Sequence, residues 1–93
     1  MSMDIIERQK QHIINECINR ILIMRETKND IEKLKKMSEQ NPDYNEENKK
    51  MIEHHVAYLK YSEDTIKNAK RLLKDIYEYD FDNEPQTAKY KDY

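Results

Sequence analysis

The side chains with potential for chemistry in this 93-residue chain are three histidines and one cysteine. A zinc site needs at least three converging ligands, often paired four residues apart on one helical face. His54 and His55 are adjacent, so they point about 100° apart on a helix, and His12 is distant in sequence. Di-iron bundles use Glu-x-x-His repeats, which no histidine here completes. The sequence therefore predicts no metal and no cofactor. His55 is expected to be a polar seam residue, and an exposed phospho-accepting role is the alternative for His54.

The cysteine and the lack of glycine argue against catalysis. Cys17 is alone, so no intrachain disulfide forms and a reducing compartment fits best. It lies on an apolar face with no adjacent base, which is typical of an inert core thiol. Glycine is absent, although ordinary usage of about 7% would supply roughly six. Because glycine provides the positive-φ positions of phosphate-binding loops and most catalytic elbows, we expect no catalytic residues and no enzyme.

Cationic side chains form a stripe on the second half of the chain. The residues of this basic stripe fall within roughly 60° of a helical wheel, and they are Lys60, Lys67, Arg71 and Lys74. The stripe could follow a phosphate backbone, so a nucleic-acid-binding helical bundle is the alternative function. Against it, acidic residues interrupt the stripe, and Glu63 precedes Lys67 by four residues in the orientation that stabilises a helix. A solvated face is the usual reason for such a pattern.

The C-terminal stretch combines acidic and aromatic residues. Residues 75–84 carry five acids and no base, and the aromatic side chains alternate with acids in the order Tyr77, Glu78, Tyr79, Asp80, Phe81, Asp82. Period-two alternation suits an extended segment that docks on a protein partner. The alternative is a frayed helix end whose tyrosines pack on the body of the protein while the acids are solvated.

The sequence predicts an all-α fold that positions the residues named above. Apolar residues recur with helical spacing and predict a long antiparallel, coiled-coil-like hairpin, with helices over about 4–40 and 45–80 and a turn at 41–45. Pro42 disfavours helical geometry at Asn41, a residue type that also suits a left-handed position. Cap-like residues at 27–30 could begin a separate helix, but no Gly or Pro enforces a break there. Residues 1–80 form the hairpin, and residues 81–93 form a flexible acidic, tyrosine-rich tail.

The second helix carries a regular apolar seam. A strict seven-residue repeat predicts left-handed supercoiling against a partner helix. The repeat residues are Ile52, Leu59, Ile66 and Leu73, and their companions are His55, Ser62, Ala69 and Ile76.

The first helix has an apolar face wider than one partner helix can cover. Eight of residues 13–24 are apolar, and seven of them span about half the helix circumference. Burying one such side chain is worth about 1.5–3 kcal/mol, so a second surface should cover them. A homodimer that forms a four-helix bundle is the predicted solution. Its dimer face would consist of Ile14, Ile18, Ile21 and Leu22. The alternatives are cover from the tail or a bent helix within one copy, and a partner protein.

The longest apolar run covers only residues 21–24, too short for a signal-peptide core or a membrane span. We therefore expect a cytoplasmic protein without membrane contact. The heavy use of Lys, Ile, Asn, Glu and Tyr suggests an AT-rich bacterial or viral genome. The predicted function is a small non-enzymatic protein-interaction module. The expected biological setting is that of a phage, viral or mobile-element accessory or inhibitor protein that binds a host macromolecule.

Overall fold

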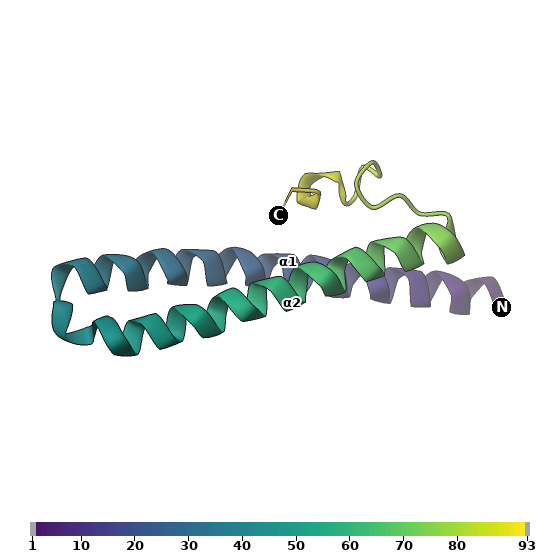
Figure 1. Ribbon diagram of the computed structural model, residues 1–93. Helices are drawn as coiled ribbons and strands as arrows, with labels where there is room; N and C mark the ends of the chain where they lie inside the picture. Colours follow the sequence, from purple (N-terminus) through teal and green to yellow (C-terminus); the bar gives the residue numbers. More distant parts are fainter. Residues whose placement is uncertain (1, 93) are drawn as a thin grey trace.

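Two long antiparallel helices make up most of the molecule (Figure 1). The computed structural model describes the backbone of residues 2–92 and the side chains of residues 4–92. α1 spans Ser2–Gln40 and α2 spans Asn45–Tyr77, with the short 3₁₀ helix η1, Pro42–Tyr44, between them and a second one, η2, at Ala88–Tyr90. The all-α helical hairpin predicted from the sequence is confirmed.

α1 is continuous through the cap-like residues that could have divided it. The Thr27 hydroxyl donates to the carbonyl of Ile23 at 2.9 Å, so it bonds within the helix and caps nothing. Met24 and Ile31, on either side of Thr27, are both buried. The apolar seam therefore holds the helix together across this stretch.

The turn between the helices has the backbone geometry that its proline imposes. Asn41 has φ −141° and ψ 88°, which is the extended geometry that a following proline imposes and not the left-handed conformation that asparagine also suits. Tyr44 precedes α2 without a side-chain cap. The buried Asn48 amide instead ties the helices together, because its Nδ2 donates to Ser38 Oγ at 3.0 Å.

The core lies along the seam between the helices, in the half of the hairpin away from the turn. Ser62 is fully buried, and Arg20 Nη1 donates to its Oγ at 3.4 Å. Ile76, expected in the seam, is 62% exposed. The buried residues that α1 and α2 contribute to this cluster are Ile14, Cys17, Ile21, Met24, Ile66 and Leu73.

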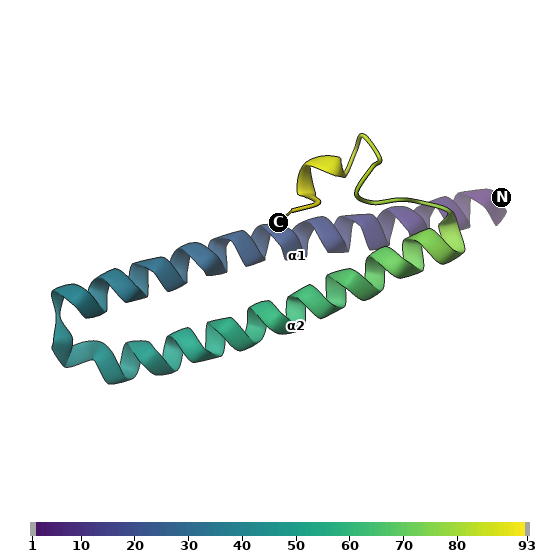
Figure 2. The same cartoon turned by 45° about the horizontal axis from the view of Figure 1, so that its top comes forward.

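The chain reverses after α2 and returns along the hairpin (Figures 1 and 2). Glu78 adopts a left-handed conformation with φ 55°, and the N–H of Tyr79 donates to the Leu73 carbonyl at 3.1 Å. We call residues 78–92 the C-terminal segment. Phe81 is 2% exposed and belongs to the core cluster.

This packing differs from the flexible tail expected from residue 81 onward. The aromatic rings of the C-terminal segment pack on apolar surface that the two helices leave uncovered, and this burial offsets the entropy lost on ordering the chain. α2 also ends at Tyr77, three residues before the expected end. Tyr93, the last residue of the predicted tail, and Met1, the first of the predicted hairpin domain, lie outside the described residues.

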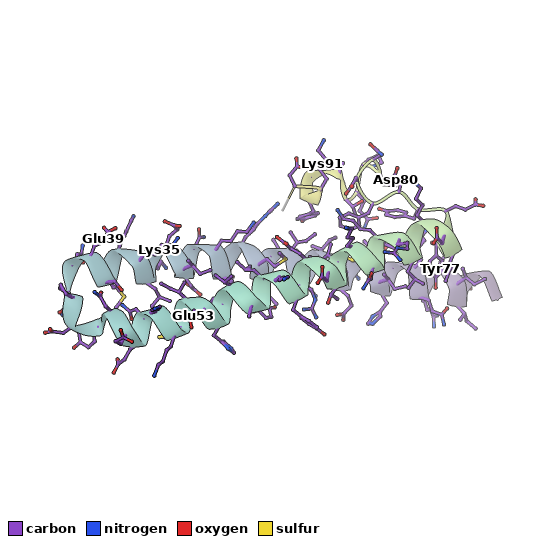
Figure 3. All side chains as sticks on the ribbon, in the orientation of Figure 1. Lys35, Glu39, Glu53, Tyr77, Asp80 and Lys91 are labelled. Atoms are coloured by element: carbon purple, nitrogen blue, oxygen red, sulfur yellow. The ribbon has the colours of Figure 1, made fainter. Side chains whose placement is uncertain are left out.

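The molecule is a rod of 60 × 20 × 18 Å with a radius of gyration of 17.4 Å. A compact domain of this length would have a radius of gyration of about 12 Å. The C-terminal segment covers only part of one flank of this rod, as the side-chain view shows (Figure 3). A large share of the hairpin surface therefore has no third element packed on it.

Candidate functional site: two flanks of the hairpin

The predicted dimer face is largely covered within one copy of the chain. Ile14 and Ile21 are both 0% exposed, and the partly buried Ile18 packs against the same core. Leu22 is 42% exposed. The C-terminal segment supplies Tyr79 and Phe81 to this core. The sequence predicted a dimer at this face because its apolar side chains needed cover. Three of the four residues already have that cover within one copy of the chain.

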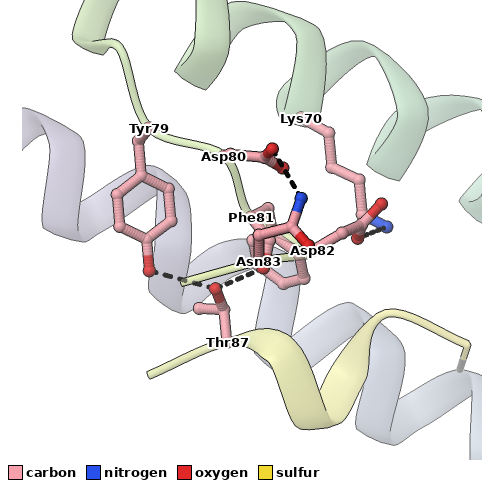
Figure 4. Close-up of polar contacts among 7 residues, drawn as sticks. All are labelled: Lys70, Tyr79, Asp80, Phe81, Asp82, Asn83 and Thr87. Carbon is pink, nitrogen blue, oxygen red and sulfur yellow. Dashed lines mark hydrogen bonds and ion pairs between the residues drawn. The ribbon is translucent and has the colours of Figure 1, made fainter. Parts of the chain in front are cut away.

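A buried hydroxyl holds the C-terminal segment in its folded form (Figure 4). Thr87 is 0% exposed. Its Oγ1 donates to the carbonyl of Phe81 at 2.5 Å and lies 3.0 Å from the Tyr79 hydroxyl. Asn83 Nδ2 donates to Asp80 Oδ2 at 2.7 Å. Because the bonds of Thr87 satisfy buried polar groups, the segment can place its aromatic rings in the core without leaving these groups unpaired.

Cations of the hairpin lie over aromatic rings of the C-terminal segment. Lys70 Nζ is 5.1 Å from the centre of the Phe81 ring and forms an ion pair with Asp82 at 2.6 Å. Lys10 lies 5.5 Å from the centre of the Tyr79 ring, and Arg25 lies 5.5 Å from the centre of the Tyr90 ring. Distances of this size are within the range of cation–π attraction. The segment therefore matches the flank beneath it in charge as well as in shape.

The basic stripe and the acidic C-terminal residues, predicted as separate binding surfaces, meet in one place. A depression of about 310 Å³ is lined by three stripe residues together with acids and aromatic rings of the segment, namely Lys67, Lys70, Arg71, Lys74, Tyr79, Asp80, Phe81 and Asp82. Lys60 is exposed and lies outside this lining. The aromatic residues face the core, so the exposed part of the predicted acidic-aromatic contact is mainly carboxylate.

Among the described residues, no such segment covers the opposite flank of the hairpin. Lys70 contacts the C-terminal segment, and Leu72 lies two residues further, about 200° around α2. Leu72 is 42% exposed. It belongs to the lining of a mostly apolar hollow of about 230 Å³ between the helices, formed by His12, Ile13, Glu16, Cys17, Arg20, Thr65, Ile66, Ala69 and Leu72. We call this flank, centred on Ile13, Ala69 and Leu72, the open face.

The open face extends along the rod beyond the hollow. A neighbouring depression shares His12 and Ile13 and adds Arg8, Gln9 and Tyr77. Ile6 lies seven residues before Ile13, so the two share one side of α1, and Ile6 is 51% exposed. Ile76, on the turn of α2 after Leu72, is 62% exposed. These residues form a row of uncovered apolar side chains, which is the kind of surface that marks an interaction site.

The titratable groups around the hollow do not form a reactive set. Burial raises the pKa of the Cys17 thiol, although the charges of Lys70 and Arg20 act in the opposite direction. The thiol therefore resists conversion to the nucleophilic thiolate. His12 Nε2 lies 3.8 Å from Glu16 Oε1 on the exposed surface. Within residues 2–92, no group of three or more His, Cys, Asp and Glu side chains is arranged to hold a metal ion.

Comparison with known proteins leaves the site to be interpreted on its own geometry. No family model, no curated protein and no solved structure matches this chain. Among the described residues, none of the helices combines the length and apolar character needed to cross a bilayer.

The open face is a surface that the sequence patterns did not predict. The seven-residue repeat predicted that Ile76 lies in the seam, and the apolar excess of α1 predicted a contact at the dimer face instead. The available signal was the spacing of Ile6 and Ile13 on one side of α1. That signal could not be used without knowing which side of the hairpin the C-terminal segment covers.

Proposed function

We propose that this protein is a small non-enzymatic interaction module that binds an amphipathic helix of a protein partner on its open face. Helix recognition of this kind places the apolar side of a helix in a hydrophobic groove. The open face offers such a groove between α1 and α2, with buried Cys17 and Ile66 at its floor. The small side chains of Thr65 and Ala69 line the groove and permit close approach of a third helix.

The proposal depends on a difference between the two flanks of the hairpin: one is covered by the C-terminal segment and the other is not. One flank is covered by a segment with aromatic anchors, an ion pair and buried hydrogen bonds. The other flank leaves Leu72, Ile76 and Ile6 between 42% and 62% exposed. Full burial of one such side chain is worth about 1.5–3 kcal/mol, so a partner that covers the row gains several favourable contacts.

The C-terminal segment is not the contact in this proposal. Tyr79 and Phe81 are already buried in the protein's own core, and Asp82 pairs with Lys70. The same arrangement weighs against the nucleic-acid alternative. Carboxylates of Asp80 and Asp82 line the depression that contains most of the basic stripe, where they would repel a phosphate backbone. The phage or viral setting indicated by composition stays a prediction.

The test uses a fluorescent, helix-locked peptide with leucines at every third and fourth position and glutamates elsewhere. We expect the intact protein to bind this peptide and Leu72→Glu to bind it at least tenfold more weakly, because a charge enters the groove. Leu22→Glu is the matched control, since Leu22 is also 42% exposed but lies outside the lining of the open face. Equal binding by the two variants would refute the proposal.

Labelled duplex DNA in the same assay tests the alternative function. Phosphate binding at the basic stripe would give affinity that falls steeply with salt and that Arg71→Glu abolishes. We expect no retention of DNA at low salt.

A further inference from the structure

We infer that the helix bound on the open face is α2 of a second copy of this chain, with both hairpins pointing in the same direction, so that α1 of each copy lies beside α2 of the other. This inference rests on the proposed function, because it names the partner of the same groove. It moves the predicted homodimer from the flank of Ile14, Ile18, Ile21 and Leu22 to the opposite flank.

α2 has the properties that the groove requires of its occupant. On the open face, α2 itself presents Leu72 and Ile76, both exposed, beside the small Thr65 and Ala69. A second copy therefore inserts apolar side chains into the groove of the first and receives equivalent ones in its own, as a two-fold interface requires. A standard interface buries about 800 Å² per partner, and a flank of a rod measuring 60 × 20 Å is large enough to supply it.

Charge complementarity selects the direction of the second copy. Arg20 bonds Ser62 across the hairpin, so it lies level with the Asp64 region of α2. Arg8 lines a depression with Tyr77, so it lies level with Asp75, half a turn before Tyr77. Asp64 and Asp75 lie about 80° and 60° around α2 from Leu72, at the edge of the open face. When both hairpins point the same way, equal levels of α1 and α2 adjoin, so each arginine of one copy lies level with one of these aspartates in the other.

The opposite direction brings like charges together. A two-fold axis across the hollow, perpendicular to the helices, would place α1 beside α1 of the second copy in reversed order. With the axis level with Glu16, at the edge of the hollow, this acid would then meet its own equivalent. Like-charge contacts of this kind cost affinity and suppress the wrong arrangement.

The first experiment measures mass by sedimentation equilibrium at micromolar concentrations for the full chain and two variants. We expect the wild type and Leu22→Glu to be dimers and Leu72→Glu to be a monomer with unchanged helical circular dichroism. A monomeric wild type would overturn the inference. A monomeric Leu22→Glu alongside a dimeric Leu72→Glu would overturn it in favour of the face predicted from the sequence.

The second experiment tests the direction by exchanging charges. Arg8→Glu places an acid opposite Asp75 of the second copy at two symmetric positions, and we expect about a tenfold rise in the dimer Kd. The double variant Arg8→Glu/Asp75→Arg restores the opposite signs and should return the Kd to within about twofold of the wild type. Failure of the double variant to recover would refute the same-direction arrangement.

The helix-locked peptide separates failure of this inference from failure of the proposed function. If the wild type is monomeric but binds the peptide through Leu72, the groove binds a helix of another protein and the second copy is ruled out. If the wild type is neither dimeric nor able to bind the peptide, both fail. A dimer that the peptide dissociates supports both.

Discussion

Replacement of Phe81 by alanine tests whether the C-terminal segment is part of the folded core. Phe81 is 2% exposed and lies in the cluster with Ile14, Ile21 and Leu73. Removing a buried phenylalanine side chain costs about 3–5 kcal/mol in the free energy of unfolding. We expect the lower value, about 3 kcal/mol, because a detached segment limits the loss to its own docking energy. This is a large fraction of the stability of a small domain, about 5–15 kcal/mol.

Urea unfolding measures this change. With a slope of about 1.5 kcal/mol per molar urea, a loss of about 3 kcal/mol lowers the midpoint by about 2 M. Tyr44→Ala removes an aromatic ring that is 50% exposed at the turn, and we expect its midpoint to fall by less than about 0.5 M. A second readout is limited trypsin digestion after Lys89, which should accelerate only for Phe81→Ala. Equal midpoints and equal digestion rates for the two variants would show that the segment does not support the core.

Four further outcomes follow from local structure. Thr87→Val leaves the Phe81 carbonyl without its buried donor and should lower stability by about 1–3 kcal/mol; Thr65→Val, which loses only an exposed bond to Tyr61, should change the urea midpoint far less. Glu78→Gly relieves the left-handed conformation of residue 78. It should raise stability by about 0.5–1 kcal/mol and with it the melting temperature. Glu63→Gly within α2 should lower the melting temperature. Cys17 should react with iodoacetamide at pH 8 only after denaturation, as followed by mass spectrometry, because burial raises the pKa of its thiol. The same shift contributes stability that is fully present below the ordinary thiol pKa of 9.0 and is lost as pH rises through the higher pKa of the folded state, and Cys17→Ala should lack this loss.

The sequence by itself determined the two-helix hairpin and most of its seam. Without glycine, and with Pro42 as the only proline before residue 85, the chain has one strong breaking point and therefore two long helices. The repeat through Ile66 and Leu73 placed those residues in the core, because residues seven apart lie on the same side of a supercoiled helix. The excess of apolar surface on α1 was also visible in the sequence, as was the need for something to cover it.

Tertiary structure alone decided what covers that surface and which flank is left uncovered. Alternating aromatic and acidic residues are compatible with an extended, solvated tail, and no local rule required Glu78 to take a left-handed conformation that turns the chain back. The choice depends on long-range contacts, such as Phe81 with the core and Lys70 with Asp82. Both flanks of this hairpin carry apolar side chains, and covering one of them leaves Leu72 and Ile76 exposed on the other. That asymmetry arises from packing between distant segments, which periodicity along a single helix does not encode.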